Sequence, residues 1–168
     1  MTVLALPTGA TLGFSYEFGV DIDIPALDVA TWFPIRKITG VAPSVTPVTA
    51  SAQTYDDLGA PNDEKTSESW SLSFTVQVNR LATTGAYTDE VEALKAYTEP
   101  SAVGTASIAH VRYYDKPANG GVPNPDDAYE GYCTVSIDRS ATGNADVGAW
   151  SVTLTGKGKR TKITNPAV

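Results

Sequence analysis

Residues 70–79 alternate between apolar and polar side chains without a break, and this stretch constrains the fold more than any other. Side chains of a β-strand point alternately to the two faces of its sheet, so the apolar row packs against a core while the polar row stays in water. A single wetted face is typical of antiparallel sheets. The stretch therefore predicts a half-buried antiparallel strand whose polar face carries Ser71, Ser73, Thr75, Gln77 and Asn79.

Residues 14–23 repeat the same alternation and predict a second strand. Phe14, Tyr16 and the next three apolar residues of the row are expected to face inward. The acids Glu17, Asp21 and Asp23 are expected on the exposed face. Weaker patterns rich in β-branched and aromatic residues predict further strands at 32–39, 107–114, 132–138 and 149–155.

One segment, residues 88–98, has the character of a short helix. Acids crowd its first turn, where the helix dipole favours negative charge, and Pro100 prevents its continuation. Val91, Leu94 and Tyr97 form one narrow apolar stripe that can dock on a sheet. A single short helix among six or more strands predicts a mostly β fold, a β-sandwich or rolled sheet with one flanking helix. The length of 168 residues fits a single domain spanning 1–168.

Two segments stand apart from this pattern. Residues 40–68 combine prolines, glycines and acids, and we expect them to form a long loop that contacts a partner. Residues 157–162 concentrate four of the 12 basic residues of a chain whose net charge is -7. Such asymmetry predicts that the basic arm at 157–168 docks on an acidic surface, for example of an identical neighbour, with a solvated, frayed tail as the alternative.

Composition excludes several classes of function. An acidic chain does not suit general binding to DNA or anionic membranes, because phosphate recognition needs clustered cations. Apolar runs such as residues 3–6 fall far short of the ~20 residues of a membrane span. No motif of a metal, nucleotide or nucleophile site has the required spacing. We therefore expect no cofactor, no metal and no enzymatic activity, with His110 and Cys133, the only residues of their kinds, in structural roles.

Tyrosines around residues 113–132 leave a carbohydrate-binding or adhesin-like β-sandwich open as an alternative. Sugar-binding modules use exposed aromatic platforms, and such a platform here would draw on Tyr113, Tyr114, Tyr129 and Tyr132. In a strand, however, one of two adjacent tyrosines faces the core.

The order of segments between residues 55 and 156 resembles the major tail tube proteins of long, non-contractile-tailed phages, especially those that infect actinobacteria. The resemblance rests on order and spacing together. It begins with Tyr55-Asp56-Asp57 and Gly59 before the strand at 70–80, followed by an acidic helix containing Glu92-Ala93-Leu94. The later segments are Val111 to Pro117 (VRYYDKP), Asn124 to Asp127 (NPDD), Gly143 to Asp146 (GNAD) and Thr153 to Gly156 (TLTG).

This resemblance implies a structural subunit that forms six-fold rings stacking into a hollow tube. The tube would surround a tape measure protein, join tail tip or baseplate and terminator proteins, and let DNA pass without specific binding. The subunit would be assembled in the host cytoplasm and reside in the virion tail. A single-ring tail connector or terminator is the alternative within the same fold.

The resemblance implies roles for two groups of residues, the channel lining and the contacts between subunits. The polar strand faces, Ser71 to Asn79 together with Glu17, Asp21 and Asp23, are candidates for the channel lining, because neutral or acidic surfaces do not retain DNA. Contacts between subunits or rings are expected from acids of the long loop and from the basic arm, namely Asp56, Asp57, Asp63, Glu64, Lys157, Lys159, Arg160 and Lys162. Free sheet edges are expected to pair with a neighbouring subunit.

Overall fold

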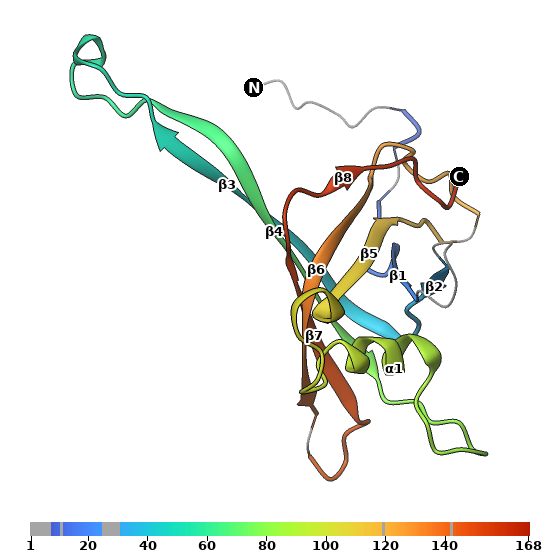
Figure 1. Cartoon of the computed structure of the whole chain (residues 1–168). Coiled ribbons are helices and arrows are strands. Elements are labelled where there is room, and N and C mark those ends of the chain that lie inside the picture. Colours follow the sequence, from blue (N-terminus) through green and yellow to red (C-terminus); the bar gives the residue numbers. More distant parts are fainter. Residues whose placement is uncertain (1–7, 11, 25–30, 119, 142) are drawn as a thin grey trace.

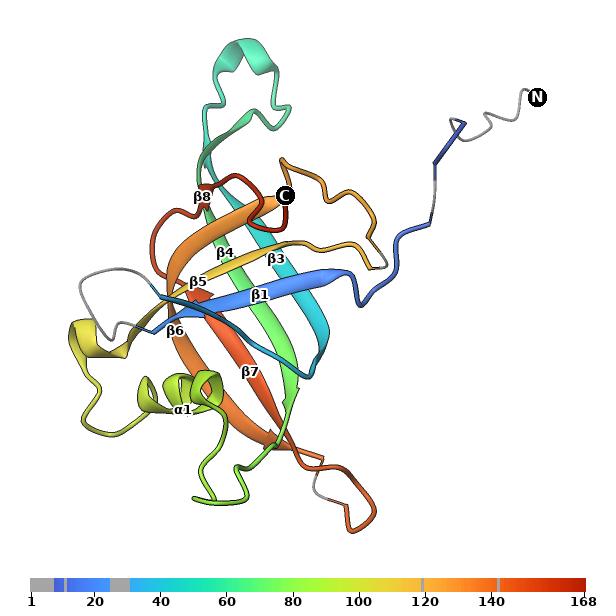
Figure 2. The ribbon, with the colours of Figure 1, turned by 90° about the vertical axis from the view of Figure 1, so that its right-hand side faces the viewer.

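The computed structural model describes residues 8–10, 12–24, 31–118, 120–141 and 143–168. Its framework is one antiparallel sheet of eight strands that curls around a core (Figures 1 and 2). The strand order is β2-β1-β5-β6-β7-β4-β3, and β8 pairs with β6. The strands are β1 (Phe18–Asp23), β2 (Trp32–Pro34), β3 (Ile38–Ser51), β4 (Asp63–Gln77), β5 (Ile108–Asp115), β6 (Ala128–Ser140), β7 (Ala149–Gly156) and β8 (Thr161–Lys162).

Helical structure is sparse. In the described part of the chain there is one α-helix, α1 (Asp89–Ala96), and two short 3-10 turns at Tyr55–Asp57 and Gly104–Ser107. Helix α1 buries Val91 and Leu94 in the core, as the apolar stripe predicts. The predicted mostly β fold with one flanking helix is confirmed, in the form of a single rolled sheet.

The core lies on one face of β4. Trp70, Leu72, Phe74 and Val76 are buried, and the intervening polar side chains face the other way, which confirms the predicted alternation. Apolar residues of β1, β5, β6, β7 and α1 complete the cluster. Full burial of an aliphatic or aromatic side chain contributes roughly 1.5–3 kcal/mol, so this row supplies much of the driving force for folding.

The predicted strand at 14–23 is too long at its start. β1 begins at Phe18, and residues 14–17 form a turn in which the Glu17 N–H donates to the Phe14 carbonyl over 3.0 Å. Phe14 and Tyr16 are exposed, so their predicted inward orientation is wrong. The register explains the difference, because Phe18 pairs with Asp115 at the end of β5 and no strand residue lies opposite the earlier positions.

The predicted strand at 32–39 is interrupted. Lys37 has a φ of 57°, a left-handed conformation that a regular strand does not contain. The chain therefore turns between β2, which ends at Pro34, and β3, which begins at Ile38.

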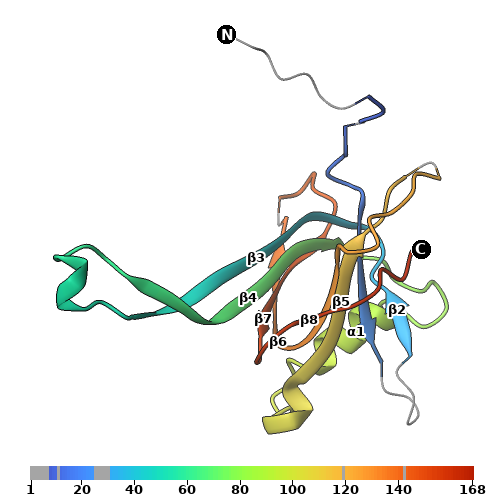
Figure 3. The same ribbon diagram turned by 90° about the horizontal axis from the view of Figure 1, so that it is seen from above.

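Residues 40–68 were expected to be a long irregular loop, and this expectation is wrong for most of the segment. β3 and the first half of β4 pair from Ser51↔Asp63 inward to form a long two-stranded hairpin that projects from the body (Figures 1 and 3). Only the apex between these strands is irregular. The prolines that indicated a loop, Pro43 and Pro47, lie on edge strand β3, where a missing N–H need not cost a ladder hydrogen bond.

No helix in the described residues is long and apolar enough to cross a membrane. The apolar run at 3–6 lies outside the described residues.

Candidate functional site

A continuous polar surface lies on β3, β4, β6 and β7, on the side of the sheet opposite the core. Cross-strand partners point to the same face, and the register places Thr134, Thr155, Ser71 and Ser44 in one row across four strands. A neighbouring row runs through Ser136, Thr153, Ser73 and Ala42. We call this surface the hydroxyl face and define it as Ala42 and Ser44 of β3, Ser71, Ser73 and Thr75 of β4, Thr134, Ser136 and Asp138 of β6, and Ser151, Thr153 and Thr155 of β7.

The hydroxyl face contains some residues that the sequence analysis singled out as an exposed polar row and others that it did not. Asp138 is its one charged member, and it has no lysine or arginine. Ser71, Ser73 and Thr75 were predicted to form an exposed polar row, but the hydroxyl residues of β6 and β7 were not singled out. Their period-two spacing, Ser151-Thr153-Thr155, is visible in the sequence. Periodicity does not predict which strands pair, so it could not show that β7 lies between β4 and β6.

Gln77 and Asn79 lie at the border of this surface. Gln77 is exposed and pairs with Ala149 at the end of β7. Asn79 follows the end of β4 and donates from Nδ2 to the Gln77 carbonyl over 3.2 Å. Both remain available to solvent beside the hydroxyl face.

Asp21 is not the solvated acid that the sequence predicts. It is 3% exposed, and its carboxylate pairs with Arg112 Nη2 at 2.8 Å and accepts a hydrogen bond from the Tyr114 hydroxyl at 3.2 Å. Arg112 lies directly opposite Asp21 in the register of β1 and β5. Burial together with the Asp21 carboxylate raises the pKa of Tyr114 to about 12. Asp21 therefore offers no free charge to a channel.

The other two predicted acids are also engaged. Asp23 faces His110, with Oδ2 and Nδ1 3.5 Å apart. The Glu17 carboxylate accepts the backbone N–H groups of Phe14 and Ala118, and these hydrogen bonds hold its pKa below the ordinary value. The acidic lining predicted from residues 17–23 thus consists of carboxylates that already have partners in the same chain.

His110 occupies an aromatic environment. Its ring stacks on Tyr132, with centroids 4.4 Å apart, and lies 4.8 Å from the Trp32 ring. In the described ranges, no three His, Cys, Asp or Glu side chains are grouped to hold a metal ion.

The tyrosines do not form a shared sugar platform. Tyr113 and Tyr114 are 3% and 7% exposed, so they cannot present their rings to a ligand, whereas Tyr132 is exposed but stacked on His110. Cys133 is fully buried, and burial raises the pKa of its thiol to about 12. Its predicted place as a small core residue is confirmed.

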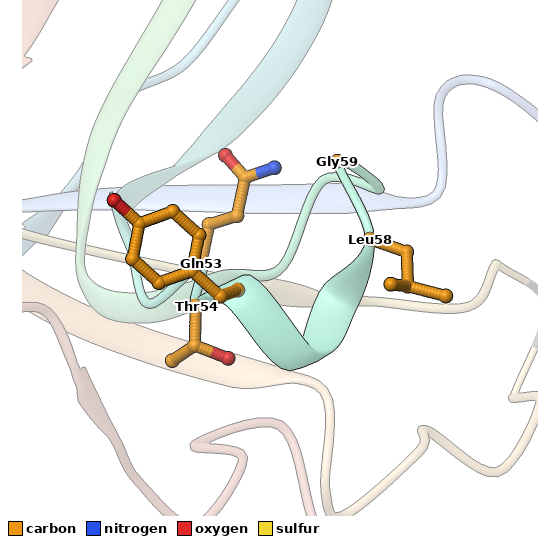
Figure 4. Close-up of a pocket in the computed structure, with 5 residues that line it drawn as sticks. Gln53, Thr54, Leu58 and Gly59 are labelled. Carbon is orange, nitrogen blue, oxygen red and sulfur yellow. The ribbon is translucent and has the colours of Figure 1, made fainter.

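The hairpin apex has a defined local structure. The Thr54 N–H donates to Asp57 Oδ2 over 2.6 Å, and Asn62 Nδ2 donates to Asp57 Oδ1 over 3.2 Å. These hydrogen bonds lower the pKa of Asp57, chiefly through the Thr54 backbone, and keep it ionised. Leu58 then adopts a left-handed conformation and points away from Gln53 and Thr54 (Figure 4).

The apex also exposes apolar surface. Tyr55 and Leu58 are almost entirely exposed and border a shallow hollow that Gln53, Thr54 and Gly59 complete. Of the four acids predicted to make contacts, Asp56, Asp63 and Glu64 are exposed, and Asp57 is engaged in capping. Exposed aromatic and aliphatic groups on a projecting element are typical of interaction surfaces.

The basic C-terminal segment is anchored to its own body. Arg160 donates to Glu68 Oε1 over 3.0 Å and to the Tyr113 hydroxyl over 2.9 Å, and its guanidinium lies 4.1 Å from the Tyr129 ring centroid. Lys162 pairs with Asp126 at 2.9 Å. A frayed tail is therefore wrong for residues 157–162. Lys157 and Lys159 remain exposed.

Trp70 fixes the start of this segment. Its indole Nε1 donates to the Gly158 carbonyl over 3.1 Å. A Cβ on Gly156 would lie 2.4 Å from the indole and one on Gly131 would lie 2.6 Å from it, so both positions require the absence of a side chain. The two glycines thus let the ring lie against the backbone of β6 and β7.

No protein-family model matches the chain, and no curated protein matches it by sequence. Its fold does match solved structures. A chain in the virion of a native gene transfer agent particle aligns at 11% identity and a TM-score of 0.62, covering 91% of this chain and 100% of the other. A chain from the tail of an empty gene transfer agent particle, refined with C6 symmetry, gives 0.60 at the same identity and coverages.

A third similar chain comes from the baseplate of the anti-feeding prophage, a six-fold symmetrised structure. It aligns at 11% identity and a TM-score of 0.57, covering 92% of this chain and 97% of the other. At this level of identity the similarities establish the fold. The chain has the fold of subunits found in a gene transfer agent virion, its C6-symmetric tail and a prophage baseplate.

Proposed function

We propose that this protein is the structural subunit of a phage-type tail tube. It polymerises as stacked hexameric rings into a hollow tube in the virion tail, after assembly in the host cytoplasm, and the tube conducts DNA during genome ejection. The fold shared with chains of six-fold tail and baseplate particles supports this proposal. It has no catalytic role, and its partners are copies of itself, a tape measure protein, and proteins of the tail tip and terminator.

The hydroxyl face is the observation that carries the proposal. Protein affinity for DNA comes largely from lysine and arginine side chains that neutralise phosphates and release counterions. A broad sheet surface of serine and threonine without a cation cannot retain DNA in this way, yet it stays hydrated. Asp138 adds weak repulsion. We therefore assign the hydroxyl face, with Gln77 and Asn79 beside it, to the channel wall.

The hairpin of β3 and β4 supplies the contact between rings in this arrangement. It buries little within its own chain and ends in the exposed Tyr55 and Leu58, which a neighbouring ring would cover. Burying both side chains would contribute roughly 1.5–3 kcal/mol each at full desolvation, before the entropic cost of association.

Negative-stain electron microscopy of the purified, concentrated protein tests the assembly. We expect hollow tubes or six-fold rings at low and moderate salt. If tail tip proteins and a tape measure protein are added and the protein still remains monomeric, a tube function is excluded.

A cysteine placed on the hydroxyl face tests the orientation of the wall. Thr153→Cys adds one exposed thiol to a chain whose only native cysteine, Cys133, is buried with a raised pKa and therefore reacts slowly. A large maleimide-polymer reagent should label the variant quickly as free subunit and far more slowly in tubes. The matched variant Glu99→Cys lies outside this face and serves as the control. Equal protection of both positions, or of neither, would contradict the assignment of the wall.

A single-ring tail component is the second candidate, favoured by the similarity to a baseplate chain. It would form closed rings of fixed size that do not stack. Electron microscopy across a concentration series separates the two, because only a tube subunit lengthens its assemblies as concentration rises.

A further inference from the structure

A preformed basic recess lies where the hairpin meets the body. Residues 65–68 of β4 form one wall, and residues 158–162 form the other. Two adjoining hollows share Glu68 and Lys159, one bordered further by Lys65 and Gly158 and the other by Tyr129 and Arg160. The contacts of Trp70 with Gly158 and of Arg160 with Glu68 hold the two walls together. The recess therefore exists before any partner binds.

The cations of this recess are only partly neutralised. Glu68 lies between Lys65, 2.9 Å away, and Arg160, 3.0 Å away, and it can offset only one of the two charges. Hydrogen bonds from Lys65 and Arg160 keep the pKa of Glu68 below its ordinary value, so it stays ionised. Lys159, which borders both hollows, is exposed and forms no ion pair with any residue that the structure describes.

The apex of the hairpin carries the opposite charge. Residues 38–64 contain Asp56, Asp57, Asp63 and Glu64 and no lysine or arginine. Asp56 is exposed between the exposed Tyr55 and the capping residue Asp57, on a turn whose shape the capping hydrogen bonds maintain. The apex is thus an acidic turn held by hydrogen bonds, with the exposed Tyr55 beside Asp56.

Asp56 of the apex cannot reach the recess of its own chain. β4 rises about 3.3 Å per residue, so Glu68 is about 17 Å from Asp63 along the strand, and Asp56 lies beyond that. Exposed charges this far apart are largely screened at physiological salt, where the Debye length is about 8 Å. Figures 1 and 3 show the apex as the part of the hairpin farthest from the body.

We propose that the basic recess receives the acidic hairpin apex of a second copy of this chain, with Asp56 of one copy placed against Lys159 of the next. This inference rests on the proposed assembly function and names the two surfaces that make it. Apex and recess are different parts of the molecule, so each copy binds one neighbour through its apex and another through its recess. Such heterologous contacts generate rings or open stacks.

Charge reversal on each side tests the pairing. Asp56→Lys and Lys159→Glu should each raise the protein concentration needed for assembly at least tenfold. An equimolar mixture of the two variants should assemble near the wild-type concentration, because each apex then meets a recess of opposite charge. The double variant D56K/K159E should do the same. Light scattering after size exclusion and negative-stain electron microscopy measure these outcomes.

Matched controls separate this contact from general charge effects. Glu99→Lys and Lys116→Glu make the same charge changes at exposed positions outside both surfaces and should leave assembly unchanged. Single variants that assemble like wild type, or a loss that neither the mixture nor the double variant restores, would overturn the pairing while wild-type tubes still support the proposed function. A wild-type protein that forms no assemblies even with tail tip and tape measure proteins added would overturn both.

A separate measurement tests whether the recess binds nucleic acid instead of the apex. Fluorescence anisotropy with a labelled DNA duplex at physiological salt should detect no binding by wild type. Binding that Lys159→Glu abolishes would make the recess a phosphate site and would refute docking of the apex.

Discussion

The two halves of β4 form one continuous strand with the same partner, β3, and yet they differ in burial and in the number of strands that they pair with. From Ser71 to Gln77, β4 also pairs with β7, and every second side chain is buried. From Asp63 to Ser69 it pairs with β3 alone, and nearly every residue is exposed. Composition follows this division, with charged residues confined to the outer half and Trp70 at the border.

This difference shows that strand formation and burial are separate outcomes. A two-stranded hairpin is marginal in water by itself, so the outer half depends on the anchored inner half for its order. Because most of its side chains stay exposed within their own chain, this surface is available to a neighbour.

Removing a core side chain from the inner half should damage the body severely. Leu72→Ala leaves a cavity at a fully buried position and should lower the free energy of unfolding by about 2–5 kcal/mol. Val48→Ala in the outer hairpin, at a 44% exposed position, should change it by less than about 1 kcal/mol. Urea denaturation of both variants measures the contrast. Equal losses would mean that the outer hairpin unfolds together with a shared core.

Crowding the indole of Trp70 should weaken the border between the halves. Gly156→Ala places a methyl group 2.4 Å from the ring, and the displacement should cost about 1–3 kcal/mol of stability. Gly148→Ala is the matched control, since its Cβ would make ordinary contacts of 3.6 Å with Val78. Thermal unfolding compares them. A tolerated Gly156→Ala would show that the indole and the C-terminal segment can shift together.

Alkaline pH should destabilise the body through its buried titratable groups. The folded-state pKa values of Tyr114 and Cys133 are raised to about 12, from ordinary values of 10.0 and 9.0. At pH values between the ordinary and the raised pKa, both groups are ionised in the unfolded chain but still protonated in the folded state. Their contribution to the free energy of unfolding is therefore fully present below about pH 9 and is lost as pH rises toward 12. Tyr114→Phe should flatten the decline between pH 10 and 12.

Tyr55→Phe at the exposed apex is the control for this titration, and its stability should follow the wild-type curve. Denaturant midpoints at several pH values provide the measurement. A wild-type curve that stays level up to pH 12 would contradict the raised values.

Restoring backbone donors on β3 should change association more than stability. Pro43 and Pro47 lack an N–H, and on an edge strand this hinders a further strand from pairing there. Pro43→Val with Pro47→Val should change the free energy of unfolding by less than about 1 kcal/mol but increase non-specific aggregation. Thr46→Val adds an apolar side chain without adding a donor and should aggregate less. If the proline variant stays as monodisperse as wild type, the prolines do not protect this edge.

These prolines also bear on the expectation that free edges pair with neighbours. β3 is a long edge strand, and its prolines disfavour regular pairing across residues 43–47. Contacts between copies through the side chains of the hairpin, as proposed for its apex, are compatible with them.

Local patterns in the sequence predicted what depends on neighbours within a few residues. The alternation at 70–79, the stripe of α1 and the burial of Cys133 all appear in the structure because period and side-chain chemistry decide which face of an element leaves water. Proline content, by contrast, indicated a loop at 40–68. The position of β3 at the edge of the sheet, a tertiary property, makes those prolines compatible with a strand.

Local periodicity and a count of charges are enough to predict the strand-rich fold, the short helix, the net negative charge and the acidic character of residues 56–64. The three-dimensional fold, by contrast, pairs Asp21 with Arg112, binds Arg160 to Glu68 of the same chain, and merges the polar rows of β4, β6 and β7 into one hydroxyl face. These partners are far apart in sequence, and the energy that joins them comes from packing and register, which no short window contains.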